Sequence, residues 1–145
     1  MNHSKAKIGR TLGLTVAIAA LTIGTATAAN SATAAVTKTA SCSTTGAKGS
    51  SVTVRPSSDP YAEVKVTLSV TDTSADGHHV RVRFVHKTSG GGVTVPWTWR
   101  SNTSGANTTK EWDTTARSTD GIYEVGVQVA RFEGDTLLNS CTDWA

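Results

Sequence analysis

The sequence has 145 residues, with 14 Lys and Arg, 11 Asp and Glu, and a formal net charge of +3. Three of the cationic residues, Lys5, Lys7 and Arg10, lie at the start of the chain, so the remaining eleven balance the eleven acidic residues. The rest of the chain is therefore near neutral and has the length of one domain. We expect neither nucleic acid nor a membrane surface among its partners.

Residues 1–28 have the pattern of a secretory signal peptide. A basic start is followed by an apolar run over residues 12–24, and a small-x-small cleavage site ends at Ala28. We expect cleavage after Ala28, with Ala34 as the second choice. The alternative is a membrane anchor, but the run is interrupted by Thr and Gly and is shorter than the roughly 20 apolar residues of a transmembrane helix. The sequence thus predicts a secreted, extracellular protein.

Residues 29–41 are rich in Ala, Ser and Thr and carry one charged side chain, Lys38. Such a segment can bury little apolar surface, so it is predicted to be a flexible N-terminal tail. It is either a spacer left after export or a docking segment that becomes ordered on a partner. The folded domain is expected to span residues 42–145.

Two cysteines, Cys42 and Cys141, lie near the two ends of this domain. In a secreted protein an even number of cysteines indicates a disulfide, which here would join the first strand to the last. The alternative is a redox-active pair, but the C-x-x-C spacing of such pairs is absent.

Alternating apolar and polar residues recur along the domain, and no stretch keeps the 3.6-residue period of an amphipathic helix. Strands are expected at 42–45, 51–55, 61–70, 79–86, 93–99 and 108–114, followed by a hairpin over 120–141 whose turn is 133–135. The expected inward-facing residues of the strands at 61–70 and 79–86 are Ala62, Val64, Val66, Leu68, Val70, Val80, Val82 and Phe84. Val52 and Val54 are expected to share one strand face, and so are Tyr123, Val125, Val127 and Val129. Short strands at this spacing, separated by polar turns, are typical of an all-β sandwich.

The stretch Asp120-Gly121-Ile122-Tyr123 resembles the tyrosine corner of immunoglobulin-like domains, in which the Tyr hydroxyl bonds to nearby backbone. We therefore expect a single immunoglobulin-like antiparallel β-sandwich of about seven to eight strands. Val125 stands where immunoglobulin domains have a cysteine, so their inter-sheet disulfide is absent. The predicted Cys42–Cys141 bridge would instead clamp the two ends of the domain.

Patterns typical of catalysis or metal binding are not found. His78 and His79 are neighbours in the sequence, so in a strand they would point to opposite faces, and His86 lies at the far end of the same strand. A zinc site needs three or four converging ligands. Glu111 and Asp113 share a strand face, which is typical of a solvated edge, with a weak calcium site as the alternative. We expect a protein that is not an enzyme and uses no cofactor or metal.

Trp97 and Trp99 are predicted to share one face of a strand, about 6–7 Å apart. Planar side chains at this spacing can stack on sugar rings, as in carbohydrate-binding modules. The same two residues would otherwise fill the core beside Val93 and Val95, or anchor a protein interface.

A basic stripe runs along the predicted strand 79–86. Its members are His79, Arg81 and Arg83, with Lys87 beyond them. Cross-strand pairing with Glu63 or Glu124 would explain the stripe, and a docking patch for an acidic partner is the alternative. The sequence offers four candidate partner-binding residues: Trp97, Trp99, Arg81 and Arg83.

Residues 129–144, V-A-R-F-E-G-D-T-L-L-N-S-C-T-D-W, together with P-W-T-W-R at 96–100, resemble small secreted proteins of filamentous actinobacteria. The size, signal peptide and end-to-end disulfide are also similar to those of the small adaptor subunit of secreted umbrella toxin particles. This resemblance implies a protein without enzymatic activity that bridges a large repeat-bearing toxin chain to a lectin subunit. A glycan-binding module using its Trp residues, and a small protease inhibitor with residues 101–107 as its exposed loop, are the alternatives.

Overall fold

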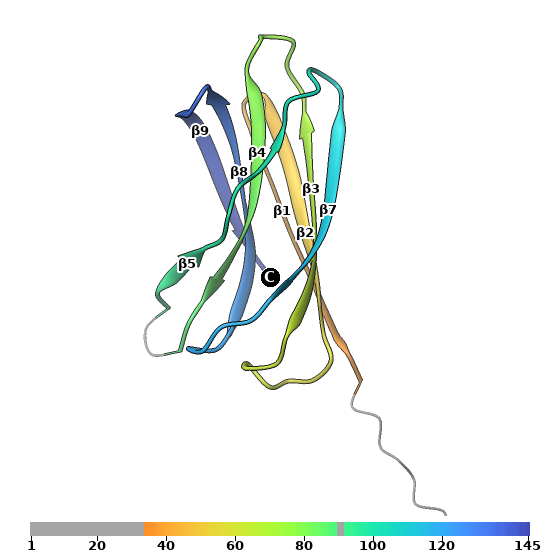
Figure 1. Cartoon of the computed structure of the whole chain (residues 1–145), viewed down its shortest axis with the longest axis vertical. Coiled ribbons are helices and arrows are strands. Elements are labelled where there is room, and N and C mark those ends of the chain that lie inside the picture. Colours follow the sequence, from red (N-terminus) through yellow and green to blue (C-terminus); the bar gives the residue numbers. More distant parts are fainter. Residues whose placement is uncertain (1–33, 90–91) are drawn as a thin grey trace, which may run out of the picture. The chain divides into compact units, whose positions relative to one another are not determined.

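The computed structural model describes residues 34–89 and 92–145, so the predicted signal peptide and the first residues of the predicted tail lie outside the described residues. The described residues form nine β-strands: β1 (Val36–Thr44), β2 (Ala47–Arg55), β3 (Val64–Asp72), β4 (His79–Lys87), β5 (Thr94–Pro96), β6 (Arg100–Asn102), β7 (Thr109–Ala116), β8 (Glu124–Glu133) and β9 (Thr136–Trp144). These strands make two antiparallel sheets (Figure 1). The first has the order β1-β2-β3-β7, and the second has the order β5-β4-β8-β9 with β6 also paired to β4.

This arrangement confirms the predicted all-β fold with two antiparallel sheets packed as a sandwich. Contacts between the sheets place β3 against β4, β2 against β8, and β1 against β8 and β9. The finer assignment as immunoglobulin-like stays a prediction.

The core lies between the two sheets and comes mainly from three strands. Its largest contributors are Val64, Val66, Leu68 and Val70 of β3, Val80, Val82 and Phe84 of β4, and Val125, Val127 and Val129 of β8. Each fully buried side chain of this size contributes about 1.5–3 kcal/mol relative to an exposed one. The alternation predicted for these three strands is confirmed.

Strand β2 buries polar side chains and not its valines. Val52 is 36 % exposed, whereas Ser51 and Thr53 are only 1 % and 3 % exposed. The register explains this, because β2 pairs with β3 so that Ser51 lies opposite the core residue Leu68. A one-residue shift in the pairing of two strands would turn every side chain of one strand to the other face of the sheet. β3 has a more continuous apolar face than β2, so β3 keeps its apolar side chains in the core. The neighbouring strand therefore decides the orientation of β2.

The flexible tail predicted for residues 29–41 is wrong for residues 36–41. These residues belong to β1, which pairs with β2 along nine positions from Val36 opposite Arg55 to Thr44 opposite Ala47. Ala40 is buried in the core. The segment is rich in Thr and contains Val, and both are β-branched residues that favour strands. The composition of residues 29–41 is typical of a linker, but the backbone groups of residues 36–41 find hydrogen-bond partners in β2.

The predicted hairpin over residues 120–141 is confirmed by the antiparallel pairing of β8 and β9, which extends to Trp144. Gly134 lies in the turn with φ of 55°, a left-handed conformation that favours glycine. A register shift between Arg131 and Phe132 marks a β-bulge near the turn. This bulge changes which residues of β9 lie opposite the end of β8.

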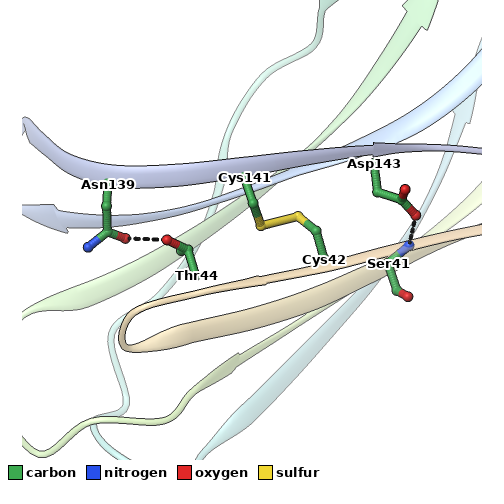
Figure 2. The surroundings of a disulfide bond; sticks show 6 residues. All are labelled: Ser41, Cys42, Thr44, Asn139, Cys141 and Asp143. Carbon is green, nitrogen blue, oxygen red and sulfur yellow. Dashed lines mark hydrogen bonds between the residues drawn. A yellow bond between two sulfur atoms is a disulfide. The ribbon is translucent and has the colours of Figure 1, made fainter.

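The predicted Cys42–Cys141 disulfide is present and joins β1 to β9, with 6.0 Å between the Cα atoms. Because these strands belong to different sheets, the bridge ties the two sheets together as well as the two ends of the domain. Figure 2 shows one hydrogen bond on each side of it. Thr44 donates to the side-chain oxygen of Asn139 at 3.1 Å, and the backbone N–H of Ser41 donates to Asp143 at 2.9 Å. We call this seam between β1 and β9 the closed side of the sandwich.

Candidate binding site

The outer face of the five-stranded sheet brings together three of the four predicted partner-binding residues. Alternation along β4 directs Arg81 and Arg83 outward, opposite to the buried Val and Phe side chains of the same strand. The Arg83 guanidinium lies 4.2 Å from the ring centre of Trp99, and that of Arg81 lies 4.2 Å from the ring centre of Phe132. Trp99 meets Phe132 edge-on, with the ring centres 5.5 Å apart. We call these four residues the outer cluster.

Arg81 has its hydrogen bonds supplied within the protein. One terminal nitrogen contacts the carboxylate of Asp135 at 2.9 Å and the carbonyl of Gly134 at 3.0 Å, while its Nε donates to His79 at 3.0 Å. The Asp135 side chain is 97 % exposed, so this ion pair contributes at most about 1 kcal/mol. Arg81 mainly holds the β8–β9 turn against β4.

Arg83 is arranged differently. Its Nε donates to Oε1 of Gln128 at 2.7 Å, and it takes part in none of the three ion pairs formed within residues 34–89 and 92–145. Partial burial lowers the pKa of Arg83 from its usual value, because desolvation disfavours the charged form. The guanidinium stays charged at neutral pH and retains N–H donors that Gln128 does not use. Arg83 is therefore a fixed cation without a carboxylate partner in the part of the chain that the structure describes.

A third cation–aromatic contact lies further along the same face. Lys87 pairs with Glu124 at 2.7 Å, which confirms the predicted cross-strand pairing with that residue, and its Nζ is 4.4 Å from the ring centre of Trp144. Trp144 covers Gly126, where an added Cβ would lie 2.7 Å from the Trp ring. The glycine thus makes room for the ring on the sheet.

Trp97 does not share a face with Trp99, so that prediction is wrong. It lies on the inner side of the sheet, partly buried against the core, and its ring centre is 5.9 Å from that of Phe84. The expected continuous strand over 93–99 ends at Pro96, and residues 97–99 connect β5 to β6 without strand geometry. The period-two rule does not hold across such a connection. Of the predicted roles, Trp97 therefore has that of a core residue.

His86 sits beside Trp97 and is almost fully buried. The indole N–H of Trp97 donates to Nδ1 of His86 at 3.0 Å, while Nε2 of His86 has no hydrogen-bond partner among the described residues. Burial lowers the pKa of His86, so the imidazole is held neutral with Nδ1 as the acceptor. His86 faces the core, whereas His79 faces outward and stacks on Phe132, so these histidines do not converge.

Tyr123 lines a cleft at one end of the sandwich and does not enter the core. It precedes β8 and is 47 % exposed, while the neighbouring Ile122 is fully buried. The phenol of Tyr123 raises the pKa of Tyr61, which lies beside it. The cleft has a volume of about 190 Å³ and is also lined by Val36 and Arg55. The tyrosine-corner role of Tyr123 stays a prediction.

Phe132 and Trp144, two aromatic residues on the outer face of the five-stranded sheet, were not identified from the sequence. The outward alternation of Glu124, Gly126 and Gln128 would have reached Phe132 if it had been continued to the end of the strand. Trp144 lies beyond the predicted end of the return strand at residue 141, and the sequence gives no signal that its ring covers a glycine.

No protein-family model, curated protein or solved structure matches this chain. Within residues 34–89 and 92–145, no three side chains of His, Cys, Asp or Glu gather closely enough to hold a metal ion. Glu111 and Asp113 lie on one exposed face of β7, as predicted. Among the described residues there is also no helix with the length and apolar character needed to cross a membrane.

Proposed function

We propose that the protein is a secreted binding protein without enzymatic activity, which serves as an adaptor or structural subunit joining other secreted proteins. The predicted signal peptide supports export, and the disulfide is typical of proteins in an oxidising compartment. The resemblance to the small adaptor subunit of umbrella toxin particles supports an extracellular toxin particle as the setting. In that setting the partners are a large repeat-bearing toxin chain and a lectin.

The arrangement of Arg83 and Trp99 carries this proposal. Arg and Trp are the residue types most enriched among those that dominate binding energy at protein interfaces. Here the guanidinium is held between Gln128 and the Trp ring, so binding a partner would order little additional side chain. A carboxylate of the partner would provide the counter-charge that Arg83 lacks among the described residues, with two parallel hydrogen bonds. The partner surface is therefore acidic at this point.

The glycan-binding alternative rested on Trp97 and Trp99 forming one flat platform. The structure places them on opposite sides of the sheet, which removes this platform. A sugar would meet only one of the two rings, together with Arg83. We therefore rank protein binding above glycan binding.

The test is affinity purification of the tagged protein from native culture supernatant, with mass spectrometry of the bound proteins. Recovery of a large secreted chain and a lectin in fixed ratio is the result expected for a toxin-particle adaptor. Recovery of the tagged protein alone contradicts the proposal, and glycan arrays and protease inhibition assays then test the two alternatives.

Variants locate the binding surface. Trp99→Ala and Arg83→Ala should each weaken binding of the recovered partner at least about tenfold, the effect of losing a central interface residue. Arg83→Lys keeps the charge but loses the planar fork, so binding should remain weaker than in the wild type. Lys65→Ala, on the exposed face of the other sheet, is the matched control and should change binding less than about twofold. Equal losses in all variants would contradict a site at the outer cluster.

A further inference from the structure

Strand β7 forms an edge of the four-stranded sheet and differs from the other edges. Among the described strands it pairs only with β3, at the edge of the sheet (Figure 1). The register of eight residue pairs is uninterrupted and has no bulge. Among the described residues, the backbone of Thr109–Ala116 makes no hydrogen bond outside this pairing. Every second residue of β7 therefore directs a free N–H and C=O away from the sheet.

The other edges are short or joined to each other. β5 and β6 have three residues each. β1 and β9 are longer edges, but on the closed side the disulfide joins them, and Asp143 of β9 accepts a hydrogen bond from the backbone of Ser41. Natural proteins protect sheet edges with prolines, bulges or inward-pointing charges. On β7 only Lys110, near one end, is a charged residue on the inward face.

The core is accessible beside this edge. A cleft of about 240 Å³ lies between the sheets, and the core residues Leu68 and Phe84 reach it together with Trp97 and Ala116. The inward row of β7 continues this apolar surface, because Trp112 lies opposite Leu68 and packs against the core. We call this the open side of the sandwich. Apolar side chains of an added strand would complete the core there.

The outward row of β7 is acidic. Glu111 and Asp113 are exposed, and neither belongs to any of the ion pairs of the described residues. Their neighbours on β3 are Ser69 and Thr67, which bring no positive charge. An added strand would place its outward side chains next to these two carboxylates. Lys or Arg is favoured at those positions, since opposite charges on neighbouring strands attract each other.

From these features we infer that β7 is a docking edge that accepts an extended segment of a partner protein, with apolar side chains facing inward and basic side chains facing outward. The partner segment becomes the fifth strand of this sheet. A second copy of β7 fits less well, because its own Glu111 and Asp113 would then lie close to those of the first copy. This inference rests on the proposed binding function and identifies a second surface for it, on a different sheet from the outer cluster.

The probe is a synthetic peptide of alternating Val and Lys with the eight-residue length of β7. We expect it to bind, with NMR shifts concentrated in the amides of β7, and a Val–Glu peptide of the same length to bind at least about fivefold more weakly. The double variant Glu111→Lys, Asp113→Lys should reverse this preference. Glu133→Lys, at an exposed position on β8, is the matched control and should leave the preference unchanged.

N-methylation separates strand addition from simple charge attraction. Methyl groups on every second residue block the N–H donors of one peptide edge and leave those of the other free. One of the two methylated forms, on all Val or on all Lys residues, should bind and the other should not. Equal binding of both forms, loss of both, or an unchanged preference in the folded charge-reversed variant would overturn the inference.

The outcome also separates this inference from the proposed function. If the peptide fails while affinity purification still recovers a partner that needs Arg83, the docking edge is wrong and the adaptor proposal stands. If the peptide binds while no partner is recovered from the supernatant, the edge is real and the adaptor proposal is wrong.

Discussion

Removing the disulfide should cost more stability than any other change of two side chains on the closed side. The double variant Cys42→Ser, Cys141→Ser frees a loop whose ends are 99 residues apart in the sequence. On the chain-entropy model, closing a loop of this length stabilises the folded state by about 4.7 kcal/mol at 25 °C. The two flanking hydrogen bonds remain, and each contributes about 0.5–1.5 kcal/mol. Since small domains are stable by about 5–15 kcal/mol, this loss is a large fraction of the total, and a domain near the lower bound would be only marginally folded.

Urea unfolding of the wild type and of the double Ser variant measures this difference, with the free energy of unfolding and its urea dependence fitted separately. We expect a loss of about 4–5 kcal/mol. Asn139→Ala, which removes only a flanking hydrogen bond, is the comparison and should cost about 1 kcal/mol. A loss below about 1 kcal/mol in the double variant would refute the loop-closure argument. It would mean that the unfolded chain keeps its ends close without the bridge, or that native strain offsets the gain.

Three further predictions concern the packing of the five-stranded sheet. Because burial lowers the pKa of His86, its contribution to stability is complete above the unfolded pKa of about 6.5 and is lost as the pH falls toward the folded pKa. In urea unfolding, the advantage of the wild type over His86→Gln should therefore shrink as the pH is lowered from about 7.5 to 5, and a constant difference would contradict this. Trp97→Phe leaves Nδ1 of His86 buried without a hydrogen-bond donor, so it should lower the free energy of unfolding by about 1–3 kcal/mol. Thermal unfolding at neutral pH measures this loss, and an unchanged melting temperature would argue against the hydrogen bond. Gly126→Ala places a Cβ 2.5 Å from the carbonyl of Asp143 and 2.7 Å from the ring of Trp144. The substitution should lower the free energy of unfolding by about 1–3 kcal/mol and shift the Trp fluorescence. An unchanged stability would show that Trp144 does not pack tightly on Gly126.

The sequence was most informative where one strand has an uninterrupted apolar face. β3 places four apolar side chains on one face, and from such a pattern the inward side follows directly. β2 offered only Val52 and Val54 against Ser51 and Thr53, and its orientation was set by pairing with β3, which no local pattern records. Strand orientation in a sandwich is thus decided by the strands with the strongest alternation.

The candidate site was predicted in part for the same reason. Arg81 and Arg83 lie within β4, whose alternation is regular, so their outward direction followed from the sequence. Trp97 and Trp99 lie in a connection between two short strands, where the backbone leaves strand geometry and spacing no longer indicates a face. Trp144 reaches Lys87, further along the same face, because β9 pairs with β8 as far as Gly126, and this follows from register and not from local sequence.

If the protein bridges two partners, as proposed, the closed side of the sandwich affects how the two docking surfaces are held relative to each other. On the closed side, the disulfide and its flanking hydrogen bonds fix one sheet against the other. The outer cluster belongs to one sheet and the edge strand β7 to the other, so fixing the sheets also fixes the geometry between the two proposed docking surfaces. Loosening this side would leave each surface intact but let their relative orientation vary, and a rigid bridge between two partners would become a flexible one. If the adaptor proposal holds, reduction of the disulfide should weaken simultaneous binding of two partners more than binding of either partner alone.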